Sequence, residues 1–317
     1  MSAYVTNAAL HAEHLSKSFA DIPIVRDVSF SLTQGDVIGL IGCNGAGKTT
    51  TMRMLTGFIT PDVGEIEVFG QNLRHNPHAV KTLIGYVPEG APLYDEMTVY
   101  EFLYFVAAAR GIPLKRRQSA LFSAVDKADL HEVLEYRIET LSKGLCRRVA
   151  LAQALIHNPP ILILDEPTDG LDPNQKKSVR TLIRTMAADK AILISTHALE
   201  EMVAVCTRLV LLSKGKIAYQ GSVSGMITAA GIDEAIRVRL AGEELSRLRA
   251  VLGARGGLTV IDEANSLRIE SPSRTAEELL SLVCQEAAGL NIIEISIVQP
   301  NYEEAFARLT GGKNIHA

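Results

Sequence analysis

The glycine-rich segment Gly42–Thr49 constrains the fold more than any other part of this chain. It has the pattern G-x-x-x-x-G-K-T, which binds phosphate where it connects a strand to a helix. The apolar run Asp36–Ile41 before it predicts a buried strand, and Thr50–Leu55 continues as a helix that Gly57 can end. A chance match in a glycine-rich turn would not need these flanking elements. We therefore expect an α/β fold with a phosphate site at this helix start.

Three side chains of this loop have specific expected roles. Lys48 is suited to reach the β- and γ-phosphates of a nucleotide, and the hydroxyl of Thr49 is suited to bind Mg²⁺. Cys43 lies near Lys48 and a helix start, which lowers a thiol pKa. We predict that maleimide labels Cys43 and that Mg-ATP protects it, although Cys43 can also be a tolerated variable position.

Composition limits the classes of protein to consider. The chain has 317 residues, 47% of them apolar and 21% charged, which predicts a well-cored globular protein with room for two domains. The net charge of −4 with no strongly basic half disfavours nucleic acid as a partner. The four cysteines suggest neither a metal site nor a disulfide framework, which favours a reducing compartment. We expect no signal peptide, and no apolar run approaches the roughly 20 residues that cross a bilayer.

Two adjacent carboxylates form the second candidate site. The apolar run Ile161–Leu164 predicts a central strand, and Asp165 and Glu166 follow it directly. Open α/β sheets bind ligands at this end of their strands. Asp165 is suited to hold Mg²⁺ through water, and Glu166 to act as a general base. Unrelated carboxylates at a strand end are usually solvated or capping groups, but the phosphate loop earlier in the chain favours the functional interpretation.

Other candidates are ambiguous on local grounds. Phe19 is either a platform for an adenine ring or ordinary core packing. Ser142 and Gly144 lie at the start of a predicted helix, where Ser142 is either an ordinary N-cap or part of a second anion-binding site. His197 follows the predicted strand Ala191–Ile194 and either contacts a γ-phosphate and orients water or is structural.

The remaining pattern divides the chain near Gly221. Before it we expect two strands, Ala9–Leu15 and Ile24–Leu32. A mostly helical region should run from Thr98 to Glu139, broken at Gly111–Pro113, and a hairpin should form at Leu209–Tyr219. After Gly221 the order is βαββαβ, which matches a ferredoxin-like unit. We favour a packing or dimer-stabilising role for this unit over binding of a regulatory ligand.

The order of the motifs resembles the ATP-binding subunit of an ABC transporter. The likeness covers about Ala9 to Gly221, and the remainder resembles the C-terminal domain of some subunits of ABC-2-type exporters. It implies a P-loop NTPase domain over 1–224, with a RecA-like core, an antiparallel β subdomain and a helical subdomain at about 88–141. A ferredoxin-like α+β accessory domain is expected over 225–317.

The resemblance also assigns roles to residues. Asp165 is the Walker B acid, and Asp169–Asp172 is the D-loop. The nucleotide contacts within one chain are Phe19, Gly42, Cys43, Asn44, Gly45, Ala46, Gly47, Lys48, Thr49 and Thr50. Ser142 and Gly144 are expected to complete the nucleotide site of the partner chain. The expected catalytic residues are Glu166, His197, Lys48 and Glu89, and the expected metal contacts are Thr49, Glu89 and Asp165. The signature Leu141–Leu145 reads L-S-K-G-L where L-S-G-G-Q is usual, and Glu89 replaces the usual Gln. These differences bear on recognition across the dimer and on the charge of the site.

The function implied is ATP hydrolysis with Mg²⁺ that powers transport through a separate membrane permease. Export is favoured by the C-terminal resemblance. Two copies are expected to pair head to tail, peripherally bound at the cytoplasmic face of the cell membrane. The alternative is a soluble ABC ATPase that remodels ribosomes or DNA, but the chain has one ATPase unit, no long coiled-coil insertion and no strong basic tract. A GTPase or small-molecule kinase ranks third, because no guanine-reading Asn-Lys-x-Asp motif is present.

Overall fold

The computed structural model describes residues 8–90, 92–241, 243–298 and 301–312. These residues form two compact units, 8–223 and Ser224–Gly312. The division lies one residue from the domain boundary expected from the sequence. Each unit has its own sheet system and hydrophobic core, and each is described by itself.

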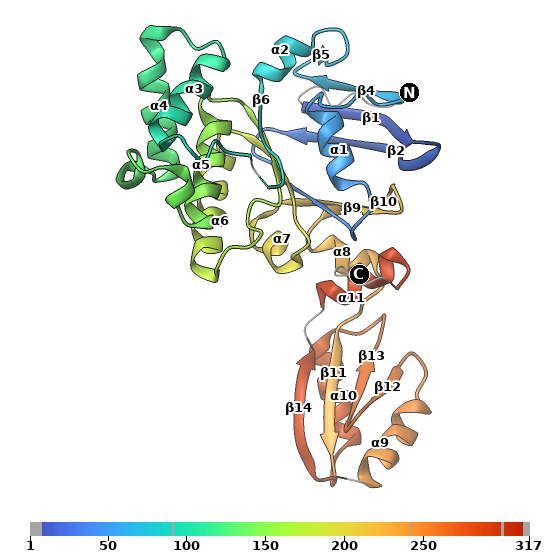
Figure 1. The fold of residues 1–317 in the computed structure, drawn as a ribbon. Coiled ribbons are helices and arrows are strands. Elements are labelled where there is room, and N and C mark those ends of the chain that lie inside the picture. Colours follow the sequence, from blue (N-terminus) through green and yellow to red (C-terminus); the bar gives the residue numbers. More distant parts are fainter. Residues whose placement is uncertain (1–7, 91, 242, 299–300, 313–317) are drawn as a thin grey trace. The chain divides into compact units, whose positions relative to one another are not determined.

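A six-stranded sheet forms the centre of the first unit (Figure 1). Its order is β10-β9-β3-β8-β7-β6, and only β10 runs antiparallel to its neighbour. The strands are β3 (Val37–Ile41), β6 (Ile84–Val87), β7 (Ile161–Asp165), β8 (Ala191–Ser195), β9 (Arg208–Ser213) and β10 (Lys216–Ser222). In β7, Ile161 and Ile163 enter one core, while Leu162 and Leu164 enter the other. This continuous apolar run is typical of a strand that is covered on both faces.

One face of that sheet packs against a second, antiparallel sheet and the helix after the phosphate loop. The order is β2-β1-β4-β5, formed by β1 (Ala8–Phe19), β2 (Ile22–Thr33), β4 (Val63–Val68) and β5 (Gln71–Asn72). The helices of this part are α1 (Lys48–Leu55) and α2 (Pro77–Thr82). The antiparallel subdomain expected from the sequence is therefore present.

Helices cover the other face, with the green helices and the blue antiparallel sheet on opposite sides in Figure 1. They are α3 (Val99–Ala109), α4 (Leu114–Ala128), α5 (Lys143–Leu155), α6 (Pro173–Ala187) and α7 (Leu199–Val205). The break expected at Gly111–Pro113 separates α3 from α4. The region from Thr98 to Glu139 is mostly helical, as expected, and α4 ends where Asp129 adopts a left-handed conformation (φ 53°). Short 3-10 turns at His131–Val133 and Ile138–Thr140 follow.

The second unit has the predicted βαββαβ order, flanked by two further helices. Its antiparallel sheet has the order β12-β13-β11-β14, and α9 and α10 pack on the core side. The elements are α8 (Gly225–Ala229), β11 (Ala235–Leu240), α9 (Glu243–Gly253), β12 (Thr259–Glu263), β13 (Ser266–Glu270), α10 (Ala276–Glu286), β14 (Ile292–Val298) and α11 (Tyr302–Thr310). In the described parts of both units, no helix is long and apolar enough to cross a membrane.

Candidate nucleotide site

The phosphate loop connects β3 to α1, as the sequence predicts. Gly47 is the N-cap of α1 and adopts φ 104°. A Cβ at this position would lie 2.9 Å from the carbonyl oxygen of Ile24, so both the backbone conformation and the available space require glycine. The loop therefore brings its backbone close to β2, with the N-terminus of α1 open toward a ligand.

Lys48 lies at the base of this loop and is only 9% exposed. Its Nζ donates to the carbonyl oxygens of Gly42 (2.7 Å) and Cys43 (3.3 Å). Burial lowers the pKa of the Lys48 ammonium group, and the nearby charges of Glu166 and Asp165 oppose that change. A buried ammonium group beside two carboxylates is suited to hold the phosphate groups of a nucleotide.

A cavity of about 450 Å³ opens over the loop. It brings together most of the residues that the sequence predicted, from four separate segments of the chain. The lining residues are Ile24, Asn44, Gly45, Ala46, Gly47, Lys48, Thr49, Thr50, Glu89, Glu166, Asp169 and His197. The phosphate loop, the Glu89 segment and the ends of two strands therefore face one space.

Asp165 lies beneath this cavity at the end of β7 and is 1% exposed. Its Oδ1 accepts a hydrogen bond of 2.5 Å from the hydroxyl of Ser195, at the end of the neighbouring strand β8. Its Oδ2 is buried and has no hydrogen-bond partner among the described residues. A buried, unpartnered carboxylate oxygen is costly unless a cation or water satisfies it. Together with the Thr49 hydroxyl, this oxygen fits an Mg²⁺ site.

Glu166 and His197 form a pair at the cavity wall. The distance between Glu166 Oε2 and His197 Nδ1 is 3.0 Å. The backbone N–H of Glu166 donates to the Ser195 hydroxyl (3.0 Å), and Glu166 adopts φ 49°, a strained region for this residue type. Burial raises the pKa of Glu166, while His197 and Lys48 oppose the rise. A carboxylate with a raised pKa beside a phosphate site is suited to accept a proton from water.

Several predicted residues do not line the cavity. Gly42 contributes its carbonyl to Lys48, and the Cys43 side chain is buried at 9% exposure. An accessible thiol at Cys43 is therefore a wrong expectation, because the loop turns that side chain into the protein. Phe19 is 48% exposed near the β1–β2 turn, with Lys17 Nζ 5.6 Å from its ring centroid. Its contact with adenine stays a prediction.

The helix start at Ser142 and Gly144 also lies outside the cavity of its own chain. Ser142 is the N-cap of α5 and accepts a hydrogen bond from the N–H of Leu145 (3.3 Å). A Cβ on Gly144 would lie 2.5 Å from Cδ of Gln175, which is on α6. A side chain at position 144 would therefore have to displace the end of the Gln175 side chain, where α5 approaches the start of α6.

Two cavity residues had no predicted contact role. Asp169 was expected as the start of the D-loop, without a nucleotide contact, and Ile24 only as a strand residue. The turn after Glu166 returns Asp169 to the cavity, with the N–H of Asp169 donating to the carbonyl of Glu166 (3.2 Å). No local sequence signal marks Ile24, because its position depends on the approach of β2 to Gly47.

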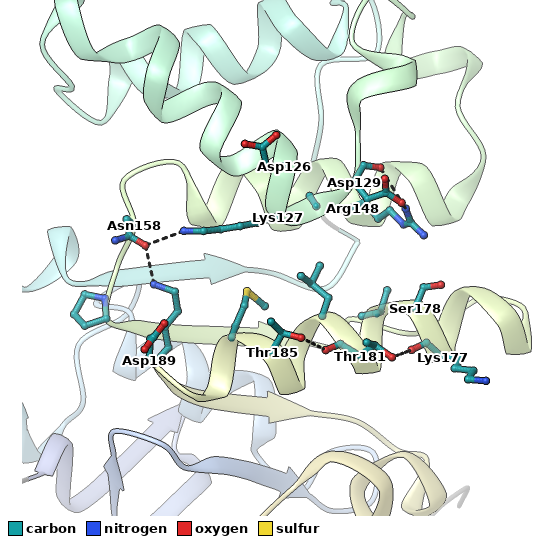
Figure 2. A pocket seen from close by; sticks show the side chains of 16 residues that line it. Asp126, Lys127, Asp129, Arg148, Asn158, Lys177, Ser178, Thr181, Thr185 and Asp189 are labelled. Atoms are coloured by element: carbon teal, nitrogen blue, oxygen red, sulfur yellow. Dashed lines mark hydrogen bonds and ion pairs between the residues drawn. The ribbon is translucent and has the colours of Figure 1, made fainter.

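A larger crevice of about 950 Å³ lies in the same unit, between the ends of α4 and α5 and the side of α6 (Figure 2). Several of its charged side chains have partners. Arg148 forms an ion pair with Asp129 (2.7 Å). Lys127 and Lys190 both donate to Oδ1 of Asn158, at 3.2 and 3.1 Å, and Figure 2 shows the contact between Lys127 and Asn158.

Comparison with known proteins identifies the family. The family described as "ABC transporter" matches residues 25–169. The chain is 33% identical over 311 residues to the Nod factor export ATP-binding protein I of Bradyrhizobium diazoefficiens, covering 97% of this chain and 98% of the relative. It is 29% identical over 305 residues to the linearmycin resistance ATP-binding protein LnrL of Bacillus subtilis, and the match covers 95% of this chain and 98% of the relative.

A solved structure agrees with this assignment. The structure described as the ATP-binding subunit of an ABC transporter has a TM-score of 0.64 and 30% identity, and it covers 71% of this chain and 94% of its own. The chain therefore belongs to the ATP-binding proteins of ABC transporters, and it is a nucleotide-binding ATPase of that family.

Proposed function

We propose that this protein hydrolyses ATP to power export of a substrate through a separate membrane permease. The observation that supports it best is the division of the predicted nucleotide contacts into two sets. The phosphate loop, Glu89, Glu166 and His197 face one cavity, whereas Ser142 and Gly144 lie outside it. A second copy of the chain, paired head to tail, would supply that missing helix start to each site.

The hydrolytic step follows from the groups around the cavity. Lys48 and the backbone N–H groups of the loop hold the phosphates. Glu166 accepts a hydrogen bond from the attacking water, and His197 holds the Glu166 carboxylate in place at 3.0 Å. Thr49 and Asp165 would hold Mg²⁺, with Glu89 facing the same cavity. Mg²⁺ neutralises phosphate charge when it is bound.

The relatives favour export over other uses of ATP. The Nod factor export protein is similar along nearly the whole chain, including the residues of the C-terminal unit. By analogy with such subunits, we place this protein at the cytoplasmic face of the cell membrane, bound peripherally to its permease. In this proposal the permease, rather than this chain, recognises the cargo.

A pull-down tests this proposal. Tagged Glu166→Gln protein would be purified from detergent-solubilised native cells with Mg-ATP, and the co-purifying proteins would be identified. We expect a polytopic membrane protein in stoichiometric amount. Recovery of ribosomal or DNA-associated proteins, with the tagged chain absent from the membrane fraction, would overturn the transport function while leaving the ATPase assignment intact.

A further inference from the structure

The two outer edges of the C-terminal sheet differ in charge and length. One edge strand, β12, has five residues, of which Asp262 pairs with Arg249 (2.8 Å) and Glu263 with Arg237 (2.6 Å). The other, β14, has seven residues, and Glu294 is its only charged one. Charged side chains on an edge strand oppose pairing with another chain, so β12 is protected and β14 is much less so.

The outer edge of β14 is unpaired and apolar. In the described parts of the chain, β14 pairs with β11 alone, and it forms one border of its sheet in Figure 1. Ile293 and Ile297 are 57% and 42% exposed. Ile297 lies opposite Ile236, and Ile295 lies opposite Val238, so both belong to the core-facing side of the sheet. The core of this unit therefore extends to an edge that its own helices leave partly open.

Only one part of β14 has regular pairing. Residues 294–298 pair in register with 239–235 of β11, whereas the pairing shifts between Glu294 and Ile292. Such an irregularity disrupts further pairing at that end. The regular part is Glu294-Ile295-Ser296-Ile297-Val298, and its middle residue is Ser296.

This segment is complementary to a second copy of itself. In an antiparallel pair centred on Ser296, Ile295 of each strand lies opposite Ile297 of the other, and Ser296 lies opposite Ser296. Glu294 lies opposite Val298, so the two glutamates are at opposite ends and do not repel each other. Centring the pair on Glu294 would place like charges together. The pattern therefore favours one two-fold register.

We propose that β14 pairs with β14 of a second copy of this chain, joining two C-terminal sheets into one continuous sheet of eight strands. This contact goes beyond the proposed ATP-dependent pairing and needs no nucleotide. It would keep two subunits together between cycles of hydrolysis, when bound ATP no longer holds them.

The first test measures the association of the full-length chain without nucleotide, by sedimentation equilibrium in the presence of EDTA. We expect a dimer that Ile297→Lys weakens by at least about tenfold, because each strand pair would then contain two lysines. The matched control is Ile261→Lys on β12, where Ile261 is 38% exposed and the substitution should leave association unchanged. A monomeric parent chain, or equal weakening by both variants, would overturn the proposal.

A cross-link tests the register. Residues opposite each other in antiparallel strands have Cα atoms about 4.5–5.5 Å apart, which is within the range that a disulfide spans. In a Cys284→Ser background, Ser296→Cys should form a disulfide-linked dimer under mild oxidation. Ile261→Cys, at the centre of β12, should not. Equal cross-linking at both positions would show random collision and reject the register.

The two kinds of dimer are separated by their nucleotide dependence. The ATP-bound dimer would be measured with Glu166→Gln and Mg-ATP in the Ile297→Lys background. ATP-driven association that survives Ile297→Lys supports two independent contacts. If Ile297→Lys abolishes the nucleotide-free dimer but ATP still drives association, only the β14 contact has been removed. If ATP fails to drive association both with and without Ile297→Lys, the proposed function is contradicted.

Discussion

The nucleotide cavity and the crevice beside α6 differ in how their charges are satisfied. The crevice is about twice as large, and there Arg148 pairs with Asp129 while Lys127 and Lys190 donate to Asn158. Next to the smaller cavity, Asp165 keeps a buried oxygen without a hydrogen-bond partner among the described residues. Burial of Glu166 disfavours its charged form and raises its pKa. An unpartnered carboxylate oxygen next to a group with a raised pKa indicates a functional site more directly than cavity volume does.

The largest expected effect comes from Glu166. The Glu166→Gln variant keeps its shape but cannot accept a proton, so turnover should fall by about 10²–10⁴-fold while ATP binding persists. Steady-state ATPase assays and a fluorescent-nucleotide titration measure both quantities. The matched crevice variant Asp126→Asn should retain turnover, since the Asp126 carboxylate pairs with His131 (2.5 Å) and does not line the nucleotide cavity. Unchanged turnover in Glu166→Gln would place the base elsewhere.

Asp165 should show a smaller, metal-specific effect. Asp165→Asn can still accept from Ser195, but it loses the charge on the buried oxygen. We expect the Mg²⁺ concentration for half-maximal hydrolysis to rise by about 10–100-fold. Nucleotide binding in EDTA should be nearly unchanged, which separates metal binding from a folding defect. If the Mg²⁺ dependence matches that of the parent protein, Asp165 has no role in holding the metal.

The pH dependence of hydrolysis should reveal the raised pKa of Glu166. Protonated Glu166 cannot act as a base, and a raised pKa means that protonation occurs at higher pH than for an ordinary glutamate. Turnover should therefore fall as the pH is lowered through that pKa, by about tenfold per pH unit below it. The residual activity of Glu166→Gln should lack this acidic limb. An identical limb in both proteins would assign it to another group.

The smallest effect on turnover is expected from the crevice. Lys190 is 6% exposed and donates to the carbonyl of Pro159 (2.5 Å) as well as to Asn158. Lys190→Met would remove the hydrogen bond to the Pro159 carbonyl and leave Asn158 with Lys127 as a donor, and it should cost about 1–3 kcal/mol of unfolding free energy. Turnover at a temperature where the protein is folded should change less than about twofold. A large loss of turnover at unchanged stability would contradict the structural role assigned to this crevice.

Much of the fold was predictable because its signals are local. The apolar runs before Gly42 and Asp165 specify strands, and the glycine pattern specifies the turn that follows the first of them. No local signal marks the end of α4, because Asp129 is not a glycine and nothing beside it in the sequence predicts a left-handed conformation. Its left-handed conformation accompanies an ion pair with Arg148, which is on the separate helix α5.

The sequence by itself determined the candidate residues for the ATPase chemistry, since each motif is a short segment whose residue types suit phosphate, metal or water. Only the tertiary structure decided how they meet. The adjacency of β7 and β8 places Ser195 and His197 beside Asp165 and Glu166, and the approach of β2 adds Ile24 to the cavity. Strand order depends on packing between distant segments, so no local pattern encodes it. The same reason explains why the burial of Cys43 and the open edge of β14 became visible only in three dimensions.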